Sequence, residues 1–181
     1  MMWVLIVLVA LVVLVAILYN GLVQAKMKVD NAWSQIDVQL QRRFDLIPNL
    51  VEACKGYMAH EEKTLTKVTE LRTSWANATT VNEKAALDGQ LSSALKTIMA
   101  VSENYPDLKA NTNFAELQEE LRATENKISY SRQFYNDTVT MYNTKIQVIP
   151  TNIIASMFGF KARDLFKVDS EEAKQNVKVS F

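Results

Sequence analysis

Residues 1–19 read MMWVLIVLVALVVLVAILY, and this stretch is the strongest structural signal in the chain. Every side chain in it is apolar or aromatic, and none is charged. As a helix rising ~1.5 Å per residue it would be about 28 Å long, close to the ~30 Å hydrocarbon core of a bilayer. Because lipid offers the backbone no hydrogen-bond partner, we expect a transmembrane helix. The residues that mark this predicted span are Trp3, Leu5, Leu8, Leu11, Leu14, Ile17 and Tyr19, with the two rings near the interfaces.

A cleaved signal peptide is the alternative interpretation of this stretch. Signal peptides carry a basic segment before the apolar run and small residues at the cleavage site. No Lys or Arg precedes this run, and its exit, Ile17-Leu18-Tyr19-Asn20-Gly21, is a poor match to such a site. The sequence therefore favours a span that is retained in the lipid bilayer.

Basic residues flank the predicted span on one side only. Lys26 and Lys28 follow it, then Arg42 and Arg43, whereas no basic side chain precedes it. Positively charged flanks stay on the cytoplasmic side of a membrane. The sequence thus predicts a single-pass protein with its N-terminus outside and the following domain in the cytoplasm.

Apolar residues after the span recur every three or four positions, the spacing of amphipathic helices. The first stripe predicts a rod that stops near residues 56–60 and kinks near Phe44, because Pro48 removes a backbone donor. It comprises Trp33, Ile36, Leu40, Phe44, Ile47, Val51, Cys54 and Met58. The second, interrupted by polar residues 77–82, comprises Leu65, Val68, either Leu71 or Arg72, then Trp75, Leu87, Leu91, Leu95, Ile98 and Val101. The third comprises Phe114, Leu117, Leu121, Thr124, Ile128, Tyr135, Val139, Tyr142, Ile146 and Ile149.

The third stripe has both of its ends marked in the sequence. Asn113 followed by Glu116 resembles a capping box at the start of a helix, and Pro150 is expected to end it. The three stripes together predict an all-α protein with three long rods, one of them broken, packed antiparallel like a four-helix bundle. We expect a transmembrane helix at residues 1–19, the bundle at 20–150, and a short apolar helix with a flexible tail at 151–181.

The amino-acid composition limits the classes of protein to which this chain can belong. Lys and Arg total 20 and Asp and Glu total 20, so the formal net charge is zero. This balance argues against a nucleic-acid-binding protein, which would be strongly basic. The chain has 4 Gly and 3 Pro, which suits a few long helices, and its single cysteine excludes an intrachain disulfide.

The residues that most often carry chemistry are scarce. Cys54 and His60 are the only Cys and His in the chain. Six residues of helix rotate by about 600°, which leaves the two on different faces, and Cys54 lies on an apolar stripe, as a buried small hydrophobe would. His60-Glu61-Glu62 lacks the second histidine of a metalloprotease helix, since residue 64 is Thr64. We therefore expect no enzymatic activity, no catalytic residue, no metal and no cofactor.

Two clusters are candidates for interaction. The polar cluster comprises Asp37, Arg42, Arg43, Asp45 and Asn49. It is either a partner-binding face or a network of intrahelical pairs and buried polar contacts that fixes helix register, and the second interpretation is favoured. The apolar cluster comprises Ile153, Ile154, Met157, Phe158 and Phe160. It is either an exposed membrane or protein interface or, as we favour, a short helix folded back on the bundle.

Several motifs resemble the LemA family over essentially the whole chain. The first set is residues 19–23 (YNGLV), 32–40 (AWSQIDVQL), 42–43 (RR), 45–51 (DLIPNLV), 55–57 (KGY) and 60–61 (HE). The second is residues 105–111 (YPDLKAN), Phe114, Leu117-Gln118, 124–128 (TENKI), Tyr135-Asn136, Tyr142-Asn143, Gly159-Phe160 and 179–181 (VSF). The resemblance implies a bacterial protein with an N-terminal membrane helix, here in the inner membrane, and a four-helix bundle. It implies no established activity, although one relative helps to form the magnetosome membrane.

Two functions fit these features. The first is a membrane-anchored, non-enzymatic scaffold that forms homo-oligomers and helps to organise or shape the membrane. The alternative is a membrane-tethered adaptor for a membrane peptidase or a signalling partner. The expected partners are the lipid bilayer, further copies of the chain and, in the alternative, another membrane protein.

Overall fold

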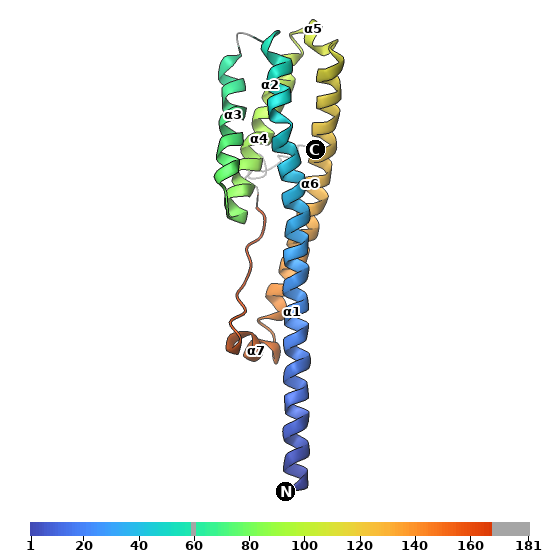
Figure 1. The fold of residues 1–181 in the computed structure, drawn as a ribbon, viewed down its shortest axis with the longest axis vertical. Coiled ribbons are helices and arrows are strands. Elements are labelled where there is room, and N and C mark those ends of the chain that lie inside the picture. Colours follow the sequence, from blue (N-terminus) through green and yellow to red (C-terminus); the bar gives the residue numbers. More distant parts are fainter. Residues whose placement is uncertain (59–60, 168–181) are drawn as a thin grey trace, which may run out of the picture. The chain divides into compact units, whose positions relative to one another are not determined.

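The computed structural model describes residues 1–58 and 61–167, and within these ranges the chain is all-α, as predicted. The helices are α1 (Met2–Asp45), α2 (Ile47–Lys55), α3 (Glu62–Asn77), α4 (Val81–Ser102), α5 (Pro106–Lys109), α6 (Thr112–Lys145) and α7 (Thr151–Met157) (Figure 1). They belong to two compact units. The anchor unit consists of Met1–Ile36 and Tyr130–Leu165, and the bundle unit consists of Asp37–Ser129 together with Phe166 and Lys167. The predicted flexible tail falls largely on residues 168–181, which lie outside the described residues.

The first rod breaks where the sequence indicates. α1 runs without interruption from Met2 to Asp45, so the predicted span continues directly into the helix that follows it. Leu46 separates α1 from α2, and Pro48 lies in the first turn of α2. Proline has no N–H to donate and its fixed φ suits the first turn of a helix. The helix is therefore interrupted at Leu46, two residues after the position at which the sequence predicts a kink.

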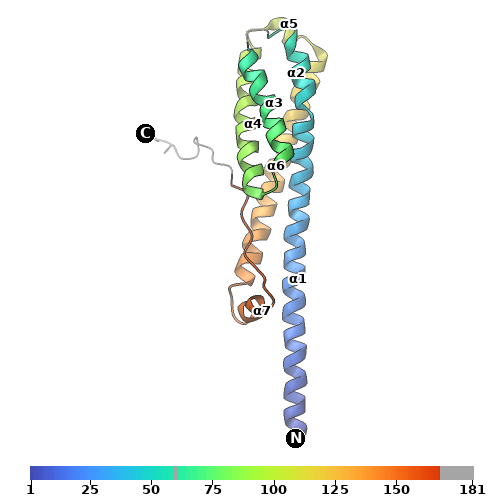
Figure 2. The same cartoon turned by 60° about the vertical axis from the view of Figure 1, so that its left-hand side comes forward.

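α3 and α4 correct the prediction that the two middle segments make one rod. The two helices pack against each other and run in opposite directions (Figures 1 and 2). The Thr80 hydroxyl accepts a hydrogen bond from the Glu83 N–H at 3.2 Å, and the Glu83 carboxylate accepts one from the Thr80 N–H at 3.0 Å. This capping box starts a new helix at Val81. The polar stretch at 77–82 is therefore a turn that reverses the chain.

The core of the bundle unit forms where the apolar stripes of its helices meet. The rings of Phe44 and Trp75 stack with their centroids 4.4 Å apart, and Trp75 Nε1 donates a hydrogen bond to Gln41 Oε1 at 3.1 Å. On α4 the buried face runs through Asp88 instead of Leu87, which is only half-buried. A charged side chain thus occupies a core position that the sequence prediction gave to its apolar neighbour.

The third rod is shifted relative to its predicted ends. α6 begins at Thr112, and the Asn111 side chain accepts a hydrogen bond from the Phe114 N–H at 3.2 Å, so the predicted capping box at Asn113 and Glu116 is wrong. Asn111 caps the N-terminus of α6 because its side chain reaches a backbone N–H of the first turn that has no partner within the helix. α6 ends at Lys145, five residues before Pro150, and Ile149 is 81% exposed instead of lying on the buried stripe.

The anchor unit is built from α1, the second half of α6 and α7. The rings of Trp33 and Tyr135 are 5.6 Å apart, and Lys145 Nζ donates a hydrogen bond to the Gly21 carbonyl oxygen at 2.8 Å. These two contacts show that α1 and α6 run antiparallel within this unit. Gly21 suits the second contact, because a Cβ there would lie 3.1 Å from Lys145 Nζ.

Candidate functional site

The predicted span is an apolar helix that the other described residues leave largely exposed. The side chains of Trp3, Leu5, Leu8, Leu11, Leu14 and Ile17 are all exposed, and Tyr19 lies at the border of exposure. The core helix of a water-soluble protein of this composition would be mostly buried. Within residues 1–58 and 61–167 no other helix is long and apolar enough to cross a membrane. The N-terminal part of α1 therefore fits a single-pass membrane protein.

α7 packs against α1 at the end of this apolar stretch. Ile154 and Ala155 are buried in a cluster with Leu22, and partly buried Val15 and Leu18 pack against that cluster. Only the N-terminal part of α1 extends beyond α7 in this unit (Figures 1 and 2). α7 thus lies level with the last turns of the apolar helix.

The apolar cluster predicted from the sequence has some side chains packed against the anchor unit and others exposed on its surface. Ile154 is buried and Phe160 is half-buried, whereas Ile153, Met157 and Phe158 are exposed. The Tyr19 ring lies 4.8 Å from that of Phe158 and 5.8 Å from that of Phe160, centroid to centroid. The helix folds back, as favoured from the sequence, yet it still presents an apolar surface.

Two buried tyrosines hold the segment that follows α7. The Tyr142 hydroxyl donates a hydrogen bond to the Lys161 carbonyl oxygen at 3.0 Å, and the Tyr135 hydroxyl donates one to the Asp164 carbonyl oxygen at 2.8 Å. Burial raises the pKa of both phenols, so both remain protonated donors at neutral pH. Asn143 exchanges two hydrogen bonds of 2.9 Å with the Arg163 backbone.

In the sequence these tyrosines stand on the apolar stripe of α6 and in the two Tyr-Asn motifs of the family resemblance, and neither pattern names their hydrogen-bond partners. A tyrosine on an apolar stripe has a hydroxyl that needs a hydrogen-bond partner once it is buried, and this requirement marks both tyrosines as candidates for a tertiary contact. Their partners lie 19 and 29 residues away along the chain, beyond the reach of a pattern within one helix.

The polar cluster is engaged in ion pairs that run mostly between helices. Arg43 is only 3% exposed, and its Nη1 lies 2.6 Å from Asp88 Oδ1 while its Nη2 pairs with Glu125. Arg42 pairs with Glu120 at 2.6 Å in an exposed position, and Asp37 pairs with Lys84. The Asp45 carboxylate accepts an intrahelical hydrogen bond from Gln41 at 2.9 Å. The sequence prediction did not name Asp88, which is the buried partner in this network.

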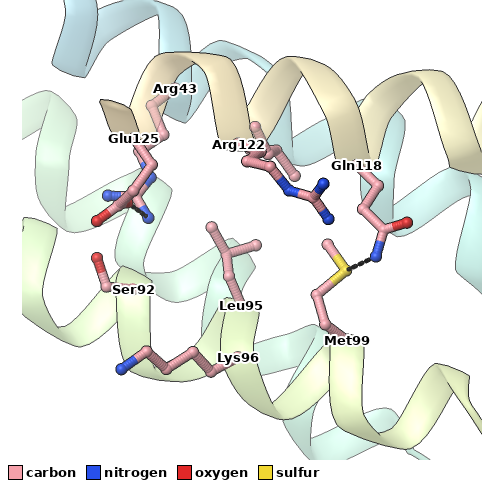
Figure 3. A pocket seen from close by; sticks show the side chains of 9 residues that line it. Arg43, Ser92, Leu95, Lys96, Met99, Gln118, Arg122 and Glu125 are labelled. Atoms are coloured by element: carbon pink, nitrogen blue, oxygen red, sulfur yellow. Dashed lines mark hydrogen bonds and ion pairs between the residues drawn. The ribbon is translucent and has the colours of Figure 1, made fainter. Parts of the chain in front are cut away.

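A pocket of about 370 Å³ opens beside the buried Arg43. Figure 3 shows Arg43, Ser92 and Glu125 at one end of the pocket, Gln118 and Met99 at the other, and Leu95 between them. Both carboxylate partners of Arg43 hold its guanidinium in place, which suits a structural role. Across residues 1–58 and 61–167, no group of three or more His, Cys, Asp or Glu side chains is placed to hold a metal ion.

Asn49 of the polar cluster lines a different groove of the bundle unit. Its other lining residues include Glu52, Glu116 and Glu120, which give this groove an acidic wall. His60, the other candidate from the sequence, lies outside the described residues.

Cys54 is fully buried on α2, and its burial raises the pKa of the thiol to about 11. An ordinary cysteine has a pKa of about 8.5, and the thiolate is the reactive form. We expect the folded protein at pH 8 to react with a thiol reagent such as DTNB at least about 100-fold more slowly than the chain unfolded in guanidinium. Equal rates in the two states would contradict the burial of Cys54.

Comparison with known proteins gives consistent matches. A model of the LemA family matches residues 32–181. The chain is 26% identical over 162 residues to Protein LemA of Metamycoplasma hominis, covering 86% of this chain and 74% of that protein. It is 26% identical over 175 residues to Magnetosome protein MamQ 2 of Paramagnetospirillum magneticum, covering 82% of this chain and 64% of that relative's length.

A third relative is Magnetosome protein MamQ of Magnetospirillum gryphiswaldense, 24% identical over 185 residues, with 88% of this chain and 68% of that protein covered. All three relatives come from bacteria, and their names describe no enzymatic activity. Because the family model covers most of its length, the chain belongs to the LemA family.

Proposed function

We propose that this protein is a membrane-anchored, non-enzymatic scaffold that self-associates and helps to organise or shape the membrane. The observation that carries the proposal is the exposed apolar helix that continues, without a break, into the rod of α1. Such a helix ties the helices behind it to the lipid surface. Two relatives named as magnetosome proteins support a role at a membrane. We also propose that the bundle lies in the cytoplasm, because Lys26 and Lys28 follow the span while no basic side chain precedes it.

An apolar stripe on α6 supports self-association. Tyr130, Phe134 and Met141 are all exposed large hydrophobic side chains of the anchor unit. At 100° per residue the three lie within about 40° of one another around the helix. Exposed apolar patches of this kind commonly mark protein interfaces.

A second copy of this chain is the partner that suits the stripe. Every copy is anchored through the same span, so each holds its stripe at the same height above the membrane. Confinement to two dimensions also raises the effective concentration of copies. Parallel copies can therefore meet stripe to stripe with the heights of their stripes already matched.

Phe134→Asp tests the stripe. We expect the full-length protein in mild detergent to be oligomeric by mass photometry, and the variant to associate about tenfold more weakly or worse. An aromatic anchor at an interface contributes ~1–2 kcal/mol or more, and each 1.4 kcal/mol is tenfold. Gln133→Asp is the matched control, because it places the same charge one residue away, off the stripe, on the same exposed stretch of α6.

A wild-type chain that remains monomeric at high concentration, both in detergent and by cross-linking in membranes, would overturn the self-association proposal. So would equal weakening by Phe134→Asp and Gln133→Asp. In either case the adaptor function would become the better account, and the acidic groove lined by Asn49, Glu52, Glu116 and Glu120 would be its candidate partner site.

A further inference from the structure

Five exposed apolar side chains gather around α7 in the anchor unit. Ile149 lies in the turn before the helix and is 81% exposed, and Met157 near its end is 71% exposed. The complete set, which we call the α7 patch, is Val148, Ile149, Ile153, Met157 and Phe158. Its members lie within eleven residues of sequence, in α7 and in the turns on either side of it.

The opposite side of α7 fixes the level of this patch along α1. Ile154 and Ala155 pack with Leu22, and the Phe158 ring contacts Tyr19 at 4.8 Å. Tyr19 is the residue at which the apolar run ends, where an aromatic ring suits the membrane interface. The patch therefore lies level with the end of the apolar run, where a membrane-spanning α1 would meet the boundary between lipid tails and head groups.

Basic side chains lie on the polar side of that boundary. Lys26, Lys161 and Arg163 line a groove with Tyr19 and Phe158. Arg163 is paired with Asp30 at 2.9 Å, whereas Lys26 and Lys161 are exposed. An interfacial segment characteristically combines an apolar face with lysine or arginine beside it, because head groups carry phosphate.

We propose that the α7 patch inserts into the lipid surface beside the transmembrane helix and forms a second, non-spanning membrane contact. The bilayer is the occupant that the structure favours, because the patch continues the lipid-facing surface of the span at the same level. This inference rests on the membrane-anchored part of the proposed function and does not depend on self-association.

The test uses the full-length protein with Cys54→Ala, carrying one new cysteine labelled with the fluorophore NBD. The three label sites are Met157→Cys in the patch, Leu11→Cys in the span, and Asn31→Cys on an exposed part of α1 about 18 Å beyond Tyr19 at ~1.5 Å per residue. The protein is reconstituted into phosphatidylcholine vesicles containing one quarter phosphatidylglycerol. Quenching by aqueous iodide is compared with quenching by lipid carrying a nitroxide near its head group.

We expect the label at residue 157 to be quenched by the lipid nitroxide and to be at least fivefold less sensitive to iodide than the label at residue 31. Iodide quenching at residue 157 equal to that at residue 31 would overturn the inference while leaving the anchor intact. Shielding of residue 157 from both quenchers would mean that protein covers the patch, which also overturns it. If the label at residue 11 were itself quenched by iodide, membrane anchoring would fail and this inference with it.

Discussion

Replacing Leu8 and Leu11 with arginine is expected to release the full-length protein from membranes. Both side chains lie near the middle of the apolar run and are exposed on the surface of α1. A charged side chain at the centre of a transmembrane helix costs ~2.5–3.5 kcal/mol on insertion scales, so the pair costs about 5–7 kcal/mol. The measurement is flotation of cell lysate on a sucrose gradient, which separates membranes from soluble protein and from sedimenting aggregates.

The matched control replaces the same two leucines with alanine. That variant shortens the side chains without adding charge, so we expect it to float with the membranes as the unaltered chain does. A double-arginine variant that still floats, or an unaltered chain that stays in the soluble fraction uncut and without detergent, would contradict the assignment of the span.

Asp88→Ala is expected to lower the free energy of unfolding of the bundle unit by about 3 kcal/mol or more. The change leaves the Arg43 guanidinium, which is 3% exposed, with Glu125 as its remaining carboxylate partner in the network. Glu125 is half-exposed, so solvent screens much of its charge. Removing one member of a buried ion pair is costly because the other charge remains buried. Urea unfolding of the full chain in detergent, followed by far-UV circular dichroism, measures the change.

Glu120→Ala is the control for this prediction. It also removes a carboxylate partner from an arginine, but the Arg42–Glu120 pair is exposed, and such pairs contribute only ~0–1 kcal/mol. The combined change of Arg43→Met and Asp88→Leu should recover much of the loss, because a buried ion pair can be replaced by apolar groups of similar volume. Equal effects of Asp88→Ala and Glu120→Ala would show that burial does not decide the role of this network.

The two predictions separate the two parts of the chain. The arginine variant should leave the helical content of the bundle unit intact while it removes the protein from lipid. The Asp88 variant should loosen the bundle while the span still holds it at the membrane. Observing both would show that the charge-free span and the buried ion pair act independently, as expected for residues without shared contacts.

The sequence was a reliable guide to features that a single helix encodes within itself. The uncharged run over residues 1–19 and the three-or-four spacing of Ile36, Leu40 and Phe44 appear in the structure as predicted. So does the break before Pro48, because a missing backbone donor acts on its own turn. Burial of Cys54 followed from its place on the same stripe.

Features that depend on a partner from elsewhere in the chain were missed or misplaced. No local pattern identifies Asp88, because its role depends on Arg43, 45 residues earlier in the chain. Pro150 predicts the end of the helix, yet α6 ends at Lys145. The Thr151 hydroxyl lies within hydrogen-bonding reach of the carbonyl oxygens of Lys145 and Val148. The periodicity of an apolar stripe predicts which face of a helix is buried, but it does not predict which other helix covers that face.

The amino-acid sequence by itself determined that this protein is helical, that its first helix suits lipid, and that it belongs among the LemA proteins. Hydrophobicity and helical period are local properties, and they can be read without knowing any contact. Three features emerge only from the folded arrangement: residues 77–82 reverse the chain, Asp88 pairs with Arg43, and α7 buries one side against Leu22 while it exposes the other. Each of these features depends on contacts between residues that lie far apart in the sequence. A local pattern of hydrophobicity does not show which residues make those contacts.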